Sequence, residues 1–152
     1  MRSLIVEDEF TSRMLLKYYL EEYGPVDVAV NGTEAVDAYK MVMSTDNPYN
    51  LICLDINLPE KDGHQALAEI RGIQTRMAGY YRKTDVKIFM TTALANMKSV
   101  QDAAGLCDED LLKPIDRTIL QERLIKHKLI NAEAAGEKET KKKTKKKTNK
   151  PE

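Results

Sequence analysis

The sequence predicts an α/β fold, a doubly wound parallel sheet of five strands with helices on both faces. Three observations lead to it. The 152 residues suit one domain. Short apolar runs alternate with amphipathic stretches through residues 1–130. Each apolar run is followed by a stretch whose apolar residues recur at helical spacing. Successive parallel strands need crossover connections, and helices usually supply them.

The strands and helices can be placed in order along the chain. Apolar runs typical of strands cover residues 3–6, 26–30, 51–54, 86–90 and 111–112. Helical spacing covers residues 10–23, 33–43, 66–73, 93–104 and 116–125. Gly24-Pro25 ends the first helix, and after a turn at Asn31-Gly32 we expect Thr33 to cap the second.

The later units follow the same logic. Residues 51–54 are apolar at every position, which is typical of a strand buried on both faces. A loop over Pro59 to Gly63 separates this strand from the third helix. The fourth and fifth strands precede the last two helices, and Asp116 is the expected cap of the final one.

Charge divides the chain into two parts. The 24 basic and 24 acidic residues give a formal net charge of zero. Eight Lys and four Glu lie in residues 131–152, so this segment carries +4 and residues 1–130 carry −4. Residues 140–150 contain seven Lys and no acidic or apolar residue, too little apolar surface to fold. We therefore predict a domain over 1–130 and a disordered Lys-rich tail over 131–152.

Several classes of protein are excluded. No apolar run approaches the ~20 residues that span a bilayer. The apolar residues 4–6 run directly into three acidic residues, unlike a secretory signal peptide. Cys53 and Cys107 are too few for a disulfide framework, so we expect reduced thiols in a cytoplasmic protein.

Chemistry-bearing residues gather at the strand ends, where ligands bind in open parallel sheets. They are Glu7, Asp8, Asp55, Thr91, Thr92 and Lys113. Two carboxylates about 4 Å apart repel by roughly 4 kcal/mol at an effective dielectric of about 20, so the cluster should hold a proton or a cation. An all-oxygen set suits Mg²⁺, and a carboxylate can attack phosphorus. The residues alone therefore predict a Mg²⁺-assisted, phosphoryl-accepting aspartate.

These residues also carry a family resemblance. The segments are Leu4 to Asp8, Asp55 to Pro59 with Asp62-Gly63, Met90 to Ala93, and Leu112 to Pro114. In this order, at strand ends, they make residues 2–130 resemble a response-regulator receiver domain of two-component signalling, which has a flavodoxin-like fold. The resemblance implies that Asp55 accepts a phosphoryl group from a phosphohistidine on a sensor histidine kinase or a histidine phosphotransfer protein.

The resemblance also implies a metal site. Asp8 and Asp55 would bind Mg²⁺ directly, Glu7 would act through a water molecule, and the backbone carbonyl of Asn57 would be a further ligand.

Roles for the remaining strand-end residues follow from the same resemblance. Thr92 would bind the phosphoryl oxygens and shift on activation; we prefer it to Thr91 because the family's hydroxyl residue precedes a small residue, here Ala93, which leaves room for the donor. Lys113 would pair with the phosphoryl oxygens, and a cis peptide bond before Pro114 would aim it. Asp110 replaces the aromatic residue expected at the switch position.

The leading hypothesis is a stand-alone receiver that acts as a phosphorylation switch or relay. It would catalyse only its own phosphorylation and dephosphorylation, act on an unknown downstream protein, and be a monomer or weak dimer. One alternative is a Mg²⁺-dependent aspartyl-phosphate phosphatase of the haloacid dehalogenase type, which needs an acid where Asn57 stands. The other is a polyanion-binding protein that uses the tail. No aromatic residue interleaves the lysines, so such contact would be nonspecific and no specific nucleic acid is predicted.

Overall fold

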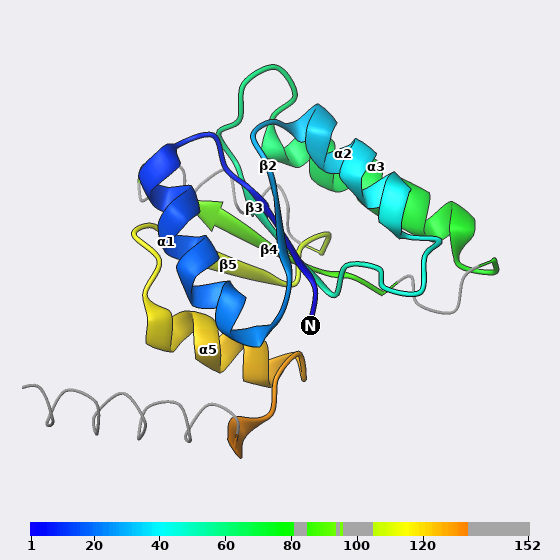
Figure 1. Ribbon diagram of the computed structural model, residues 1–152. Helices are drawn as coiled ribbons and strands as arrows, with labels where there is room; N and C mark the ends of the chain where they lie inside the picture. The colour runs from blue at the N-terminus through cyan, green and yellow to red at the C-terminus, as the bar shows by residue number, and fades with distance from the viewer. Residues whose placement is uncertain (81–84, 94, 96–104, 134–152) are drawn as a thin grey trace, which may run out of the picture.

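The computed structural model describes residues 1–80, 85–93, 95 and 105–133. Its centre is a parallel sheet in the order β2-β1-β3-β4-β5 (Figure 1). The strands are β1 (Ser3–Val6), β2 (Val26–Ala29), β3 (Leu51–Asp55), β4 (Lys87–Thr92) and β5 (Glu109–Leu112). The predicted fold class is confirmed, and the strand order reverses between β1 and β3, where such sheets open a crevice for ligands.

Helices cover both faces of the sheet (Figure 1). They are α1 (Phe10–Leu20), the short 3₁₀ helix η1 (Glu21–Tyr23), α2 (Gly32–Val42), α3 (Gly63–Met77) and α5 (Arg117–Lys126). Helices α1 and α5 lie against one face, and α2 and α3 against the other. The helix expected over residues 93–104 and the tail expected over 131–152 fall largely outside the described residues.

The core consists of two apolar layers, one on each side of the sheet. Ile52 and Leu54 pack with α2 and α3, whereas Leu51 and Cys53 pack with α1 and α5. All five residues of β3 are buried, as the continuous apolar run predicts. Burial raises the pKa of the Cys53 thiol to about 12, so this cysteine is a packing residue. None of the helices in the described part of the chain is long and apolar enough to span a membrane.

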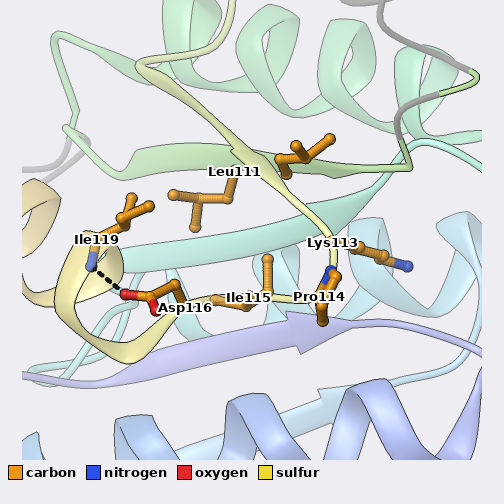
Figure 2. Close-up of a pocket in the computed structure, with 7 residues that line it drawn as sticks. Leu111, Lys113, Pro114, Ile115, Asp116 and Ile119 are labelled. Atoms are coloured by element: carbon orange, nitrogen blue, oxygen red, sulfur yellow. Dashed lines mark hydrogen bonds between the residues drawn. The ribbon is translucent and has the colours of Figure 1, made fainter.

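One predicted cap is wrong. Asn31, not Thr33, caps α2: its side-chain oxygen accepts a hydrogen bond from the backbone N–H of Glu34 at 2.8 Å. The backbone at Asn31 is extended, as a cap requires, whereas Thr33 already lies inside the helix. Asp116 caps α5 as predicted, by accepting from the N–H of Ile119 at 3.0 Å (Figure 2).

Helix α3 is longer than its apolar spacing indicates. It begins at Gly63 because Asp62 and Gln65 form a capping box, in which each side chain accepts from the other residue's backbone N–H. Helix α3 therefore starts directly at the end of the loop that follows Asp55.

Truncation of a core side chain tests this packing. Ile70 on α3 is fully buried against the sheet, so Ile70→Ala should lower the free energy of unfolding by about 2–5 kcal/mol. Met41 on α2 is 76% exposed, and Met41→Ala should change it by less than ~0.5 kcal/mol. Urea unfolding measures both, and equal effects would contradict the assigned core.

Candidate functional site

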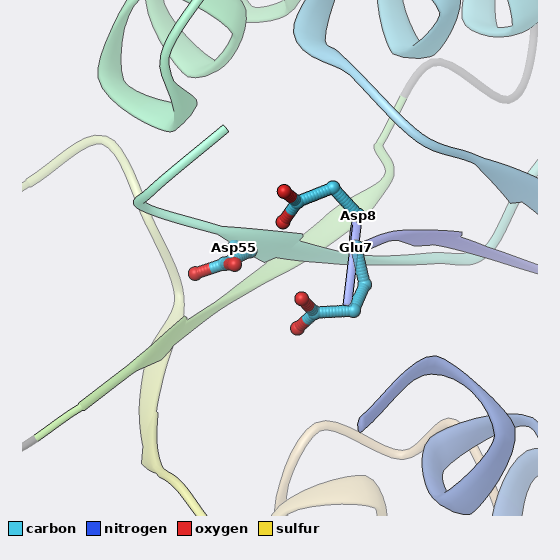
Figure 3. A group of neighbouring side chains, drawn as sticks. All are labelled: Glu7, Asp8 and Asp55. Carbon is cyan, nitrogen blue, oxygen red and sulfur yellow. The ribbon is translucent and has the colours of Figure 1, made fainter. Parts of the chain in front are cut away.

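Three carboxylates converge at the carboxyl ends of two neighbouring strands (Figure 3). Glu7 and Asp8 follow β1, and Asp55 ends β3; one oxygen of each lies within 4.8 Å of the others. Glu7 and Asp55 are buried, whereas Asp8 is exposed. Because β1 and β3 pair in parallel and in register, the sheet itself brings these residues together.

Lys113 supplies a positive charge to this cluster. Its Nζ lies 2.5 Å from Oε2 of Glu7 and 3.0 Å from Oδ2 of Asp55. The residue follows β5, and its backbone N–H donates to the carbonyl of Thr92 at 2.7 Å, which extends the pairing with β4. The peptide bond between Lys113 and Pro114 is cis, as the resemblance implies.

Burial and neighbouring groups shift the pKa values of Glu7 and Lys113. Burial raises the pKa of Glu7, and the nearby Asp55 adds to this effect, while the hydrogen bond from Lys113 lowers it in part. Burial alone would lower the pKa of Lys113. Its hydrogen bonds to Glu7 and Asp55 together outweigh that effect, so the pKa of Lys113 is raised and the ammonium stays charged.

The backbone after Asp55 turns back on the carboxylate of that residue. The N–H of Asn57 donates to Oδ1 of Asp55 at 3.2 Å, and the N–H of Ile56 donates to the carbonyl of Thr91 at 3.2 Å. The carboxylate of Asp55 thus has one oxygen held by a backbone amide and the other by Lys113.

Both threonines lie buried at the end of β4. Thr91 is the register partner of Asp55 across the β3–β4 pair, and Thr92 lies one residue further along. The hydroxyl of Thr92 donates to the carbonyl of Ala93 at 3.1 Å. The structure therefore brings Thr92 and Ala93 to the site's edge, while the preference for Thr92 over Thr91 stays a prediction.

Asp110 lies apart from the carboxylate cluster. It is exposed on β5, and its Oδ1 accepts from the Cys107 thiol at 3.5 Å. Partial burial of the carboxyl group raises the pKa of Asp110 and the nearby Glu109 charge adds to this, while the Cys107 contact lowers it in part. The side chain at the expected switch position is therefore a solvent-facing carboxyl group.

Sequence reasoning missed Arg13 on α1. Its Nη1 donates to the carbonyl oxygens of Glu7 and Asp8, both at 3.0 Å, and so holds the turn that presents the two acids. The only sequence signal is a basic residue in the first helical turns after an acidic strand end.

The donor set fits a divalent cation. Counted at formal charge, the three carboxylates and the Lys113 ammonium sum to −2, which a doubly charged ion would balance. All the candidate ligand atoms are oxygens, and the exposed Asp8 leaves room for the water ligands that Mg²⁺ retains. The residues present therefore fit Mg²⁺ better than a softer metal.

Comparison with known proteins gives the family. A sequence model of the response regulator receiver domain matches residues 3–125. The chain belongs to this family. The chemotaxis protein CheY of Bacillus subtilis is 32% identical over 128 residues, which cover 82% of this chain and 95% of CheY. This receiver domain of two-component signalling accordingly belongs to a class of phosphorylation switches and relays.

Solved structures agree with this assignment. The co-crystal structure of the Saccharomyces cerevisiae phosphotransfer protein Ypd1 with the receiver domain of Ssk1 contains a similar chain, with a TM-score of 0.70 and 25% identity over 82% of this chain and 86% of that one. The receiver domain of the Pseudomonas aeruginosa kinase PA1611 has a TM-score of 0.65 and 26% identity, covering 82% and 94%. It was solved with magnesium in its active site cleft. Several other curated relatives are much longer, and this chain spans only 6% to 10% of them.

Removal of the Lys113 charge should change the titration of Glu7. Lys113→Met removes the bond that favours ionised Glu7, so the pKa of Glu7 should rise further above its ordinary value of 4.5. The folded state then holds a proton that the unfolded state releases, so stability should fall as pH rises from 4.5 through the raised pKa.

Carboxyl ¹³C NMR in EDTA measures this pKa, and urea unfolding across the same pH range measures the stability. Lys17→Met is the matched control, because Lys17 of α1 pairs with Glu21, the first residue of η1, away from the cluster. An unchanged or lower Glu7 pKa in Lys113→Met would contradict the assigned interaction.

Proposed function

We propose that this receiver accepts a phosphoryl group on Asp55 from a phosphohistidine of a sensor histidine kinase or histidine phosphotransfer protein. The observation that carries the proposal is the placement of the Asp55 carboxylate, which lies 3.0 Å from the Lys113 ammonium and beside Glu7 and Asp8. Asp55 is buried, is the last residue of the central strand β3 and lies 3.0 Å from the ammonium. Glu7 shares the burial and the contact with Lys113, and the family resemblance supports Asp55 as the acceptor.

The transfer is a single displacement at phosphorus. A carboxylate oxygen of Asp55 bonds to phosphorus while the P–N bond of the donor breaks, and the imidazole nitrogen retains that electron pair. Lys113 already lies within 3.0 Å of Asp55, so its ammonium can pair with the phosphoryl oxygens after transfer. Thr92 is the proposed hydroxyl donor to the same oxygens, and Ala93 leaves space for the donor.

The metal site is assigned to the same edge of the sheet. Asp8, Asp55 and the backbone carbonyl of Asn57 would hold Mg²⁺, and Glu7 would act through a water molecule. When bound, the ion neutralises charge on the transferring group and its donor. The protein holds the acids in place through the β1–β3 pairing and through the two bonds from Arg13.

The biological role we propose is a stand-alone switch or relay. The match over 95% of CheY supports this role, and the Ypd1–Ssk1 complex supports a phosphotransfer protein as donor. The reactions would be confined to the receiver's own phosphorylation and dephosphorylation. Because Asp110 replaces the switch aromatic, output would depend on other contacts of the phosphorylated state.

The acceptor can be tested directly. With Mg²⁺ and a small-molecule phosphodonor, the wild-type chain should gain one base-labile phosphate, and Asp55→Asn should gain none because the nucleophilic carboxylate is lost. Asp37→Asn, an exposed position on α2, is the control and should be modified like the wild type. Intact-mass spectrometry reports the result; an unmodified wild-type chain, or a modified Asp55→Asn, would refute the assignment.

The metal site has its own test. Asp8→Asn removes one charged oxygen ligand, so the Kd for Mg²⁺ should rise about tenfold or more, equivalent to ~1.4 kcal/mol. Isothermal titration calorimetry measures this Kd, with Asp37→Asn again as the control. Equal affinity of Asp8→Asn and wild type would exclude Asp8 as a ligand.

A further inference from the structure

The loop that follows the acceptor is closed tightly on itself. We call residues 56–62 the acceptor loop; it contains Asn57, the proposed carbonyl ligand. The N–H of Gly63 donates to the carbonyl of Ile56 at 2.9 Å and closes the loop's base. Glu60 has φ 65°, in the left-handed region that non-glycine residues seldom adopt, so the chain reverses sharply near the loop's far end. Because the loop is short and closed at its base, a displacement of the Lys61 backbone would also shift the backbone of Asn57.

The far end of the acceptor loop rests on the first residue of α2. Gly32 is buried, and a Cβ added there would lie well under 3.0 Å from the backbone carbonyl oxygen of Lys61, a separation that real Cβ atoms essentially never show. That oxygen would have to move by about 1 Å to restore ordinary contact. Asn31 caps α2 at this point, so the helix start is fixed and the loop is the part that must move.

A second contact holds Lys61 from the other side. The Lys61 ammonium is paired with Glu69 of α3, and Glu69 lies 3.7 Å from Lys40 of α2. The backbone of Lys61 therefore lies against α2 while its head group is held by α3. The acceptor loop is anchored at both neighbouring helices.

We propose that Gly32 is a positioning residue for the magnesium site: by lacking a Cβ, it lets the Lys61 carbonyl dock on α2, and this contact and the Lys61–Glu69 pair set the position of Asn57. The inference rests on the proposed magnesium site. Mg²⁺ demands near-ideal octahedral geometry, and misplacement of a group by ~1 Å at a reacting site can cost ~10²-fold.

The test compares two glycine substitutions of the same size. Gly32→Ala should shift the amide NMR signals of residues 55–63 in EDTA and raise the Kd for Mg²⁺ about fivefold or more. Gly72→Ala on α3 is the control, because its Cβ would meet only the end of the Arg76 side chain at 3.4 Å; it should leave both unchanged. Phosphorylation of Gly32→Ala should be slow at low Mg²⁺ and recover at saturating Mg²⁺, which a loss of folded protein would not produce.

A double variant identifies the atom responsible. Gly32→Ala with Lys61→Ala keeps the backbone carbonyl of Lys61, so Mg²⁺ affinity should stay weak. If the shorter side chain restored affinity, crowding by the Lys61 side chain would explain the effect and the proposal would be wrong. If Gly32→Ala does not fold, Glu69→Gln tests the other anchor: it should weaken Mg²⁺ binding about twofold or more, and unchanged affinity would overturn the proposal.

The outcomes separate this inference from the proposed function. A wild-type chain that binds no Mg²⁺ would refute the magnesium site and the inference together. A wild-type chain that binds Mg²⁺ and is phosphorylated, beside a Gly32→Ala chain of equal Mg²⁺ affinity, would refute the inference alone.

Discussion

The ammonium of Lys113 lies between two buried carboxylates, and the carboxyl edge of the sheet depends on this interaction. Glu7 and Asp55 are nearly inaccessible to solvent, and without a positive charge their burial would be costly. The pairing offsets only part of the desolvation of Glu7, because the pKa of Glu7 stays raised despite the hydrogen bond from Lys113. The apolar interior of the sheet therefore ends in a polar cluster that is only partly compensated.

The order of the strands produces this cluster. Glu7 follows β1 and Asp55 ends the neighbouring strand β3, whereas Lys113 follows the edge strand β5. The ammonium reaches the centre because the backbone of Lys113 continues the pairing with Thr92 of β4. A site of opposite charges thus forms at the switch point of the sheet, where a partner can approach from outside the strand ends.

The Lys113 ammonium would serve both the unphosphorylated protein and the proposed phosphoryl transfer. Before transfer, Lys113 offsets the negative charge of the acids; after transfer, it would offset that of the phosphoryl group. Around it, Arg13 and Gly32 act on the backbone rather than on the reacting atoms. Asp110, by contrast, faces solvent beside Cys107, so a carboxyl group rather than an aromatic ring stands three residues before Lys113.

Local signals in the chain predict the parallel α/β fold, because strand and helix periods can be recognised from neighbouring residues. They also predict that Glu7, Asp55 and Lys113 meet, because the strand ends of a parallel sheet share one edge. Tertiary structure alone decided three features: the 2.5 Å pairing of Lys113 with Glu7, the bonds of Arg13 to the β1–α1 turn, and the docking of Lys61 on Gly32. Even the cap of α2 is Asn31 rather than Thr33, because the backbone is extended at Asn31 and Thr33 already lies inside the helix. Such contacts leave no periodic trace in the chain, since they depend on how elements distant in sequence approach one another in the packed fold.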